Sequence, residues 1–261
     1  MHRIALGVRY DGAAYHGWQS QENLTTVQGM VESALSFVAN HQVNVVCAGR
    51  TDAGVHASAQ VIHFDTKSYR DDHSWVYGAN SNLPQDISIL WAKPVDQTFH
   101  ARFSAVARRY RYVVYNHDIR PGILRRSIGW YYKQLDAKRM QDAAEHLLGK
   151  HDFSSFRGAG CQAKNPDRLI HQIEIYRIRR MLVIEVQANA FLLHMVRNIV
   201  GVLVEIGSGA KPVGWAREVL DARDRTKAGM TISPNGLYLV EVTYPMEFKL
   251  PRVPLGPFFL P

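Results

Sequence analysis

The sequence predicts an α+β fold with two similar α/β halves and a largely antiparallel sheet. Three observations support this. Strand-like and helix-like segments mix in both halves of the chain, and several of the strand segments alternate apolar and polar residues. The 261 residues also suffice for one large or two small packed domains. Strands with one open face suit an antiparallel sheet, whereas continuous apolar runs suit a parallel one.

The first half contains one strongly periodic helix between strand-like segments. Apolar residues at steps of three and four predict a helix over 27–39, with Thr25 or Thr26 as its cap. Glycine-containing loops are expected at 11–23 and 49–56. The other expected elements are strands over 4–10, 43–48, 60–65 and 87–94 and a helix over 71–80.

The second half repeats this mixture of elements. Strands are expected over 108–116 and 237–244, with a hairpin formed by 169–179 and 181–188. Helices are expected over 137–148, between Asp136 and Gly149, and over 191–206 and 215–222. We therefore expect subdomains at 1–100 and 101–245, followed by an extended Pro-rich tail over 246–261.

The charge balance points to a polyanionic partner. Lys and Arg number 31 against 23 Asp and Glu, which gives a formal charge of +8. Such an excess favours nucleic acid, although a solvated basic surface explains it equally well. No apolar run reaches the length of a membrane span. The only two cysteines, Cys47 and Cys161, exclude a disulfide scaffold and suit a reducing cytosol.

The segment AGRTDAGVHA at 48–57 is the first candidate for chemistry. It places Arg50, Asp52 and His56 on one tight loop after a strand, and its glycines permit sharp turns. A carboxylate beside a guanidinium is kept ionised and can act as a nucleophile or base. An ordinary Asp–Gly turn with a surface ion pair remains the competing interpretation.

The segment ARFSAVARRYRYVVY at 101–115 is the second candidate. Arginines interleave with tyrosines here, and on a strand Arg108 shares a face with Tyr110, while Arg109 shares the other with Arg111. Arginines bind phosphates and tyrosines stack on unpaired bases. A strand with one core face and one charged face explains the same pattern.

Two further segments leave their roles open. Arg197 in FLLHMVRN lies at the rim of the predicted helix, where it can reach solvent or a carboxylate. The aromatic residues of the loop at 10–21 suit either ligand contact or the core.

The twelve histidines and two cysteines show no metal-ligand spacing, and no Gly-rich nucleotide-binding motif is present, so we expect no metal and no nucleotide cofactor.

Together these segments resemble the TruA-type tRNA pseudouridine synthases. The similar blocks span the chain, and GRTDAGVH is the most specific of them. Ala59 departs from the family, which often has Gly there, and so predicts a slightly less flexible loop. The blocks are YDGAAYHGWQSQ at 10–21, AGRTDAGVHA at 48–57, FHARFSAVARRYRY at 99–112, HDFSSFR at 151–157, ANAFLLHMVRN at 188–198, GLYLVEVTYP at 236–245 and the tail PLGPFFLP.

The resemblance implies an isomerase, an intramolecular transferase that converts uridine to pseudouridine at positions 38, 39 and 40 of the tRNA anticodon arm. It further implies a cytoplasmic homodimer with two subdomains around a basic central cleft, no cofactor and no metal. On the matching positions Asp52 is the catalytic carboxylate, Arg50 shares its loop, Arg197 pairs with Asp52, and Tyr110 stacks on the target uracil. The other implied substrate-binding residues are Arg108, Arg109, His56 and Leu237.

The chemistry of these residues agrees with that implication. Isomerisation breaks the bond from ribose to ring nitrogen and reattaches the base through carbon, so it needs no water or cofactor. A carboxylate can stabilise or trap the ribose, as in retaining glycosidases. Two alternatives stay open: an RNA-binding protein without catalysis, and a metal-dependent phosphodiesterase with Asp11 and Asp52 as ligands.

Overall fold

The computed structural model describes residues 1–260, which divide into two compact units. Unit 1 comprises Met1–Ala107 and Tyr238–Pro261, and unit 2 comprises Arg108–Leu237. The first break thus falls at 107/108 rather than at the expected 100/101. The last strand and the tail belong to unit 1, because residues 238 and 239 pair with its strand β3.

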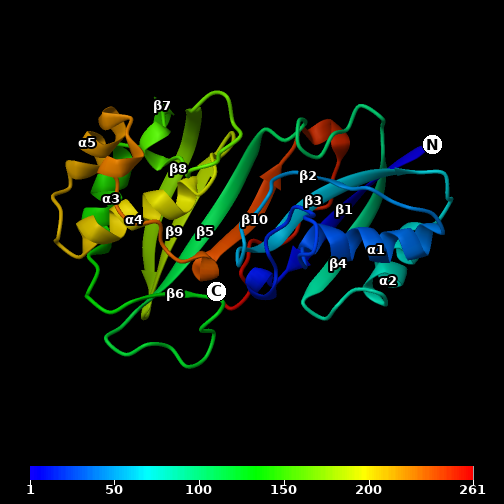
Figure 1. Cartoon of the computed structure of the whole chain (residues 1–261), viewed down its shortest axis with the longest axis horizontal. Helices are drawn as coiled ribbons and strands as arrows, with labels where there is room; N and C mark the ends of the chain where they lie inside the picture. Colours follow the sequence, from blue (N-terminus) through cyan, green and yellow to red (C-terminus); the bar gives the residue numbers. More distant parts are fainter. Residues whose placement is uncertain (261) are drawn as a thin grey trace. The chain divides into compact units, whose positions relative to one another are not determined.

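Unit 1 is a sheet with two helices, and Figure 1 shows helices α1 and α2 close together in it. The strand order is β4, β1, β3, β10, and the short β2 also pairs with β3. All pairs are antiparallel except β3 with β10. The elements are β1 (His2–Tyr10), α1 (Val27–Ala39), β2 (Val46–Cys47), β3 (His56–Thr66), α2 (Asp72–Asn80), β4 (Ile87–Val95) and β10 (Leu237–Thr243).

The helix starts of unit 1 follow from their capping residues. The Thr26 hydroxyl accepts the Gly29 N–H, and the Asp71 carboxylate accepts the Ser74 N–H. Both acceptors satisfy amide groups that a helix leaves unpaired in its first turn. The predictions for 27–39 and 71–80 are confirmed, the latter within one residue.

The strand predicted over 43–48 is wrong for its first part, since β2 covers only Val46–Cys47. Side chains of α1 take the amide groups that a longer strand would need. Val43 N–H donates to Ser36 Oγ at 2.9 Å, and Val45 N–H donates to Glu32 Oε1 at 2.9 Å. The prediction for 60–65 was too short, because β3 begins at His56 and includes Ala59, so the family departure lies in a strand and not in the loop.

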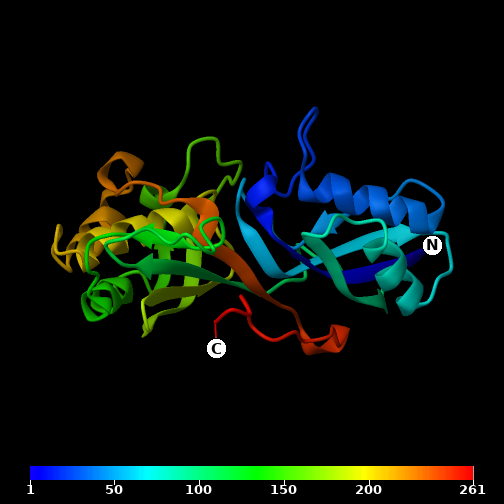
Figure 2. The same cartoon turned by 90° about the horizontal axis from the view of Figure 1, so that it is seen from below.

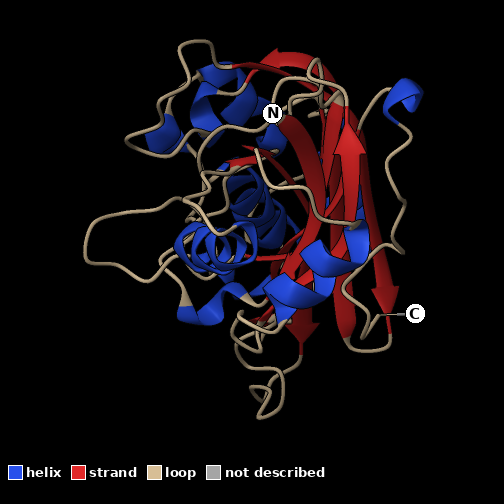
Figure 3. Cartoon of the chain, turned by 90° about the vertical axis from the view of Figure 1, so that its right-hand side faces the viewer, coloured by secondary structure: helices blue, strands red, loops and turns tan. Residues whose placement is uncertain are grey.

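Unit 2 contains five further strands and three α-helices. Its strand order is β5, β9, β8, β7, and β6 pairs with β5 in parallel, the only parallel pair among the pairings described within this unit. The elements are β5 (Ala107–Asn116), β6 (Gly129–Tyr131), α3 (Ala137–Glu145), β7 (Gly149–Asp152), β8 (Asp167–Ile178), β9 (Met181–Ala188), α4 (Met195–Gly207) and α5 (Trp215–Ala222). Figure 3 distinguishes the strands from the helices by colour.

Two helices of unit 2 are shorter than predicted. Helix α3 ends at Glu145, and the chain reaches Gly149 through a turn before β7 begins. Helix α4 begins at Met195 rather than at Phe191, because His194 has a left-handed conformation with φ of 60°. The helical spacing of apolar residues therefore extends into residues 191–194, although their backbone is not part of the helix. Arg197 consequently lies in the first turn of α4.

The architecture confirms an α+β fold with a mostly antiparallel sheet. No helix in residues 1–260 is long and apolar enough to cross a membrane. Both cysteines are free thiols, and burial raises the pKa of Cys47 to about 12. The C-terminal segment leaves β10 as an extended chain with one 3₁₀ turn (Met246–Phe248), coloured red in Figure 2.

Candidate active site

The loop that carries Asp52 joins β2 to β3 and is fixed at its start by one buried glutamine. The Gln60 side chain on β3 donates to Gly49 O at 2.6 Å and accepts the Gly49 N–H at 3.4 Å. Ala48 N–H donates to Val61 O at 2.8 Å. Gln60 has no exposed surface. Because its amide is shielded from water, these bonds hold the loop entrance in a single geometry.

The segment 10–18 fixes the rest of the Asp52 loop. Trp18 N–H donates to Thr51 O at 3.0 Å, and Gly54 N–H donates to Tyr15 O at 3.3 Å. The Tyr10 and Thr51 hydroxyl groups are 2.8 Å apart. Tyr10, Tyr15 and Trp18 are all buried. The aromatic residues of this segment therefore belong to the core, which answers the question that the sequence left open.

Two glycines allow this close approach. A Cβ at Gly12 would lie 1.9 Å from Val55 O, and a Cβ at Gly17 would lie 2.7 Å from Thr51 O. Gly17 also has φ of 87°, a conformation that side chains with a Cβ rarely adopt. The motif at 10–21 is thus explained by backbone packing against the Asp52 loop.

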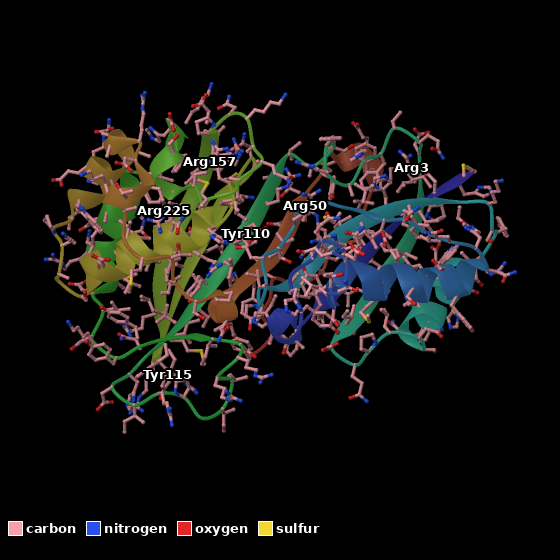
Figure 4. All side chains as sticks on the ribbon, viewed as in Figure 1. Arg3, Arg50, Tyr110, Tyr115, Arg157 and Arg225 are labelled. Carbon is pink, nitrogen blue, oxygen red and sulfur yellow. The ribbon has the colours of Figure 1, made fainter. Side chains whose placement is uncertain are left out.

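Asp52 itself is half-buried, and Arg50, which Figure 4 labels, is exposed. A tight turn follows Asp52, with Val55 N–H donating to Asp52 O at 3.1 Å and φ of 77° at Gly54. The loop is therefore a rigid platform on which one carboxylate remains within reach of a ligand. This is the arrangement that a nucleophile or general base requires.

His56 lies at the start of β3 and is almost fully buried. Its ring stacks on Tyr238 with centroids 4.6 Å apart. Gly12 N–H donates to His56 Nδ1 at 3.1 Å, and an Asp11 carboxylate oxygen lies 2.9 Å from the same nitrogen. His56 thus connects the segment 10–18, the Asp52 loop and β10, and its contacts support a positioning role.

Tyr15 adds a second anchor that sequence reasoning missed. Its hydroxyl donates to Asp86 Oδ1 at 2.5 Å. Burial and the Asp86 carboxylate raise the pKa of Tyr15 far above its ordinary value, so the hydroxyl keeps its proton. Asp86 lies between α2 and β4, 71 residues after Tyr15 in the sequence, so no local sequence pattern predicts this contact.

In unit 2, Tyr110 and Arg108 lie on one face of β5, as the strand alternation predicts. The Tyr110 ring meets Phe191 edge to face, with centroids 5.0 Å apart. The Arg108 guanidinium is largely buried and donates to Asn189 O at 2.9 Å. Figure 4 labels Tyr110 on this strand. Phe191, which sequence reasoning placed in a helix, instead supports the Tyr110 ring from the segment before α4.

Arg109 and Arg111 share the opposite face of β5 with buried Glu185 of β9. Arg109 Nη1 forms an ion pair with Glu185 Oε1, and Arg111 Nε lies 2.6 Å from Glu185 Oε2. Glu185 is 3% exposed. The shielded Glu185 carboxylate is thus balanced by two guanidinium groups, which in turn find their negative partner within the sheet. Arg109 therefore has an evident structural role, and its predicted role at the substrate remains untested.

Arg197 and Leu237 are the remaining predicted site residues of unit 2. Arg197 Nε donates to Ile232 O at 2.8 Å from the first turn of α4. A cation at a helix N-terminus is electrostatically unfavourable, which indicates a role other than helix stability. Its charge acts on the Tyr112 hydroxyl, whose pKa is nevertheless raised by burial. Leu237 is buried at the start of β10.

The structure therefore brings Arg50, Asp52 and His56 together on one loop and strand start in unit 1. Tyr110, Arg108, Arg109 and Arg197 belong to unit 2, so the predicted pair of Asp52 with Arg197 joins residues of different units and stays a prediction. Within residues 1–260, no three His, Cys, Asp or Glu side chains lie as metal ligands would.

Comparisons with known proteins decide the family. A family model described as tRNA pseudouridine synthase matches residues 7–104 and 143–245. A tRNA pseudouridine synthase A of Coxiella burnetii is 74% identical over 261 residues and covers 100% of both chains. One from Shewanella amazonensis is 54% identical over 259 residues, 99% of each chain. The chain belongs to the tRNA pseudouridine synthase family.

The resemblance stated from the motifs is thus confirmed, and the protein is an isomerase that forms pseudouridine in tRNA. Among solved structures, a chain of a Cbf5–Nop10–Gar1 complex aligns with a TM-score of 0.39 and 11% identity. The alignment covers 90% of this chain and 48% of that chain. This likeness is too low to add to the argument, so the family assignment rests on the sequence matches.

Proposed function

We propose that the chain isomerises uridine to pseudouridine at positions 38, 39 and 40 of the tRNA anticodon arm, with Asp52 as the nucleophile. One observation carries the role of Asp52. Its loop is fixed from both sides by buried backbone contacts, yet Asp52 itself is half-exposed. A charged group that only stabilised the fold would not require such a platform.

The reaction conserves the atoms of the nucleotide except for one exchanged proton. The bond from ribose C1′ to uracil N1 breaks, the base rotates while bound, and a bond forms from C1′ to C5. The hydrogen on C5 leaves as a proton, and N1 gains one. Asp52 stabilises or traps the reacting centre, as carboxylates do in retaining glycosidases. The base itself is the acceptor, so one carboxylate suffices.

The other residues have supporting roles in this proposal. Arg197 pairs with Asp52 and favours its ionised form, with Arg50 on the same loop. Tyr110, held edge to face by Phe191, stacks on the uracil that has left the RNA stack. Arg108, Arg109, His56 and Leu237 shape the substrate site. The protein acts as a cytoplasmic homodimer on tRNA, without metal or cofactor, in a basic cleft.

The test is release of tritium from tRNA labelled at uracil C5, measured in the presence of a chelator. Wild type should release tritium from uridines of the anticodon arm. Asp52→Asn should lower turnover by more than about 10⁴-fold, the scale on which removing a nucleophile acts. It should leave tRNA affinity within a few-fold, because the carboxylate does not bind phosphate.

The matched control is Asp142→Asn, which removes the charge of a half-exposed aspartate that pairs with Lys138 on helix α3. It should turn over like wild type. Full activity of Asp52→Asn would remove the nucleophile assignment. No release by wild type, with tRNA binding intact, would favour an RNA-binding protein without catalysis. Activity that requires a divalent metal would favour the phosphodiesterase alternative.

A further inference from the structure

Residues 117–133 of unit 2, here called the basic–aromatic segment, present side chains that the proposed function does not use. The segment joins β5 to the turn before α3 and contains β6. Figure 1 shows it as a long loop that extends from the end of β5, beside Tyr115 in Figure 4. We propose that this segment is an additional RNA-contact surface that stacks unpaired bases and contacts phosphates of the tRNA, an inference that rests on the proposed function.

The first argument is the exposure of large apolar side chains. Trp130 is 43% exposed and Tyr132 is 57% exposed, with ring centroids 6.4 Å apart. Ile119 and Ile123 are even more exposed. Single exposed apolar residues are ordinary, but a group within one segment marks an interaction site. Two neighbouring aromatic rings are the feature on which unstacked bases bind.

The second argument is charge. Arg120, Arg125, Arg126 and Lys133 are all exposed, whereas Asp118 is the only acidic residue of the segment. An Asp118 carboxylate oxygen lies 2.9 Å from His117 Nδ1. Among residues 1–260, neither Arg120 nor Arg125 forms an ion pair. Their guanidinium groups are therefore available for phosphate oxygens, which they bind with bidentate geometry.

The third argument is that the segment is ordered without a ligand. Trp130 Nε1 donates to His117 O at 2.8 Å, which fixes one ring against the loop. Asn116 donates to Tyr131 O at 3.1 Å and to Lys133 O at 2.6 Å. Lys133 Nζ lies 5.7 Å from the centroid of the Tyr132 ring. A preformed surface loses little conformational entropy when RNA binds, and so retains more of its contact energy.

The charge also distinguishes RNA from a second copy of the chain as the occupant. In a twofold dimer the same surface patch lies on both sides of the interface. With four cations against one acidic residue, the segment has too few carboxylates to pair with the same segment of a second copy. The phosphates of RNA are complementary to this charge. The segment therefore suits RNA better than self-association.

The first experiment removes the rings. Trp130→Ala with Tyr132→Ala should weaken binding of unmodified tRNA by about a hundredfold, since each of the two base–aromatic stacks contributes about tenfold. Turnover at saturating tRNA should stay within about twofold, because the rings take no part in the chemistry. Trp130→Phe with Tyr132→Phe keeps both rings and should restore affinity. Tyr69→Ala, which removes an 83% exposed ring of unit 1, is the control.

The second experiment removes the charges. Arg120→Ala with Arg125→Ala should reduce the slope of log affinity against log salt by about 1 to 2, one for each lost phosphate contact. The control Arg217→Ala removes an exposed arginine that is paired with Asp221 on α5. It should leave the slope unchanged. An unchanged slope in the double variant would overturn the phosphate contacts.

Two further measurements decide between the possible occupants. Ultraviolet cross-linking of wild type to tRNA should yield cross-linked peptides that contain Trp130 or Tyr132. Sedimentation of the ring variant should show the same particle mass as wild type. A changed mass with loss of affinity would identify the segment as a protein interface and overturn the proposal. Wild-type tritium release reports on the proposed function independently of all these outcomes.

Discussion

The Asp52 loop of unit 1 and strand β5 of unit 2 are held by different kinds of contact. In the loop, uncharged groups of Gln60, Tyr10 and the backbone fix the chain on both sides of Asp52, which is itself half-exposed. On β5, Arg109 and Arg111 are paired with Glu185 inside the sheet. The comparison teaches that the backbone of the Asp52 loop is positioned by neutral contacts, whereas the guanidinium groups on β5 are held by a shielded carboxylate.

The largest effect is expected from a substitution that breaks the group of charges on β5 and β9 of unit 2. Glu185→Gln leaves the cations Arg109 and Arg111 without their shared carboxylate. We expect a loss of about 3–5 kcal/mol in the free energy of unfolding of unit 2, the cost of leaving a shielded charge unbalanced. Urea unfolding, with hydrogen exchange on β5 and β9 to localise the loss, measures it. Glu174→Gln, an exposed position opposite Glu185 on β8, is the control and should cost little.

The next effect tests whether unit 1 tolerates a new charge. Burial lowers the pKa of His63 to about 4, with the nearby positive groups Arg3 and His100 adding to the shift and Asp65 opposing it. Ala101 N–H donates to His63 Nδ1 at 3.1 Å, which requires the neutral ring. In the unfolded chain His63 has its ordinary pKa near 6.5, so the free energy of unfolding should be at its full value above that pH. It should fall by roughly 3 kcal/mol as the pH drops to 4.

His63→Gln provides the control for that pH dependence, because its side chain oxygen can accept the same N–H without titrating. Its free energy of unfolding should vary less between pH 6.5 and pH 4 than that of wild type. Equal slopes in the two proteins would show that other groups, such as His100, carry the effect.

A smaller effect tests the neutral contacts that hold the Asp52 loop. Gly17→Ala must place a Cβ 2.7 Å from Thr51 O at a positive φ, and should cost about 2 kcal/mol while lowering turnover more than tRNA affinity. Gly209→Ala has a similar φ of 78° with no atom within 4 Å of its Cβ. It isolates the backbone cost and should leave turnover unchanged. Equal losses of turnover in both variants would contradict the role assigned to Gly17.

The smallest effect concerns a single hydrogen bond. Tyr10→Phe and Thr51→Val each leave one buried hydroxyl without the partner it has at 2.8 Å, and each should cost about 1 kcal/mol of stability. The double variant should cost less than the sum of the two, because no polar atom is then left behind. A double-mutant cycle in thermal unfolding measures this coupling. Strict additivity would show that the contact is unimportant to the loop.

Much of the fold could be predicted because local signals coincide with element ends. Thr26, Asp71 and Asp136 each accept amide protons at a helix start, where the sequence places them. The errors share a cause in long-range contacts. Ser36 and Glu32 of α1 shorten β2, and the left-handed His194 delays α4. Neither event leaves a trace in the periodicity of apolar residues.

The sequence by itself determined the fold class, the family and the loop that carries Arg50, Asp52 and His56, because these depend on residue order and spacing. Only the tertiary structure decided that Tyr15 is anchored by Asp86 and that Arg109 is balanced by Glu185, 76 residues away. The sequence does not distinguish a buried or paired arginine from an exposed one, because burial and partners depend on segments that are far apart in the chain. Those partners determine whether a charge serves the fold or remains available to a substrate.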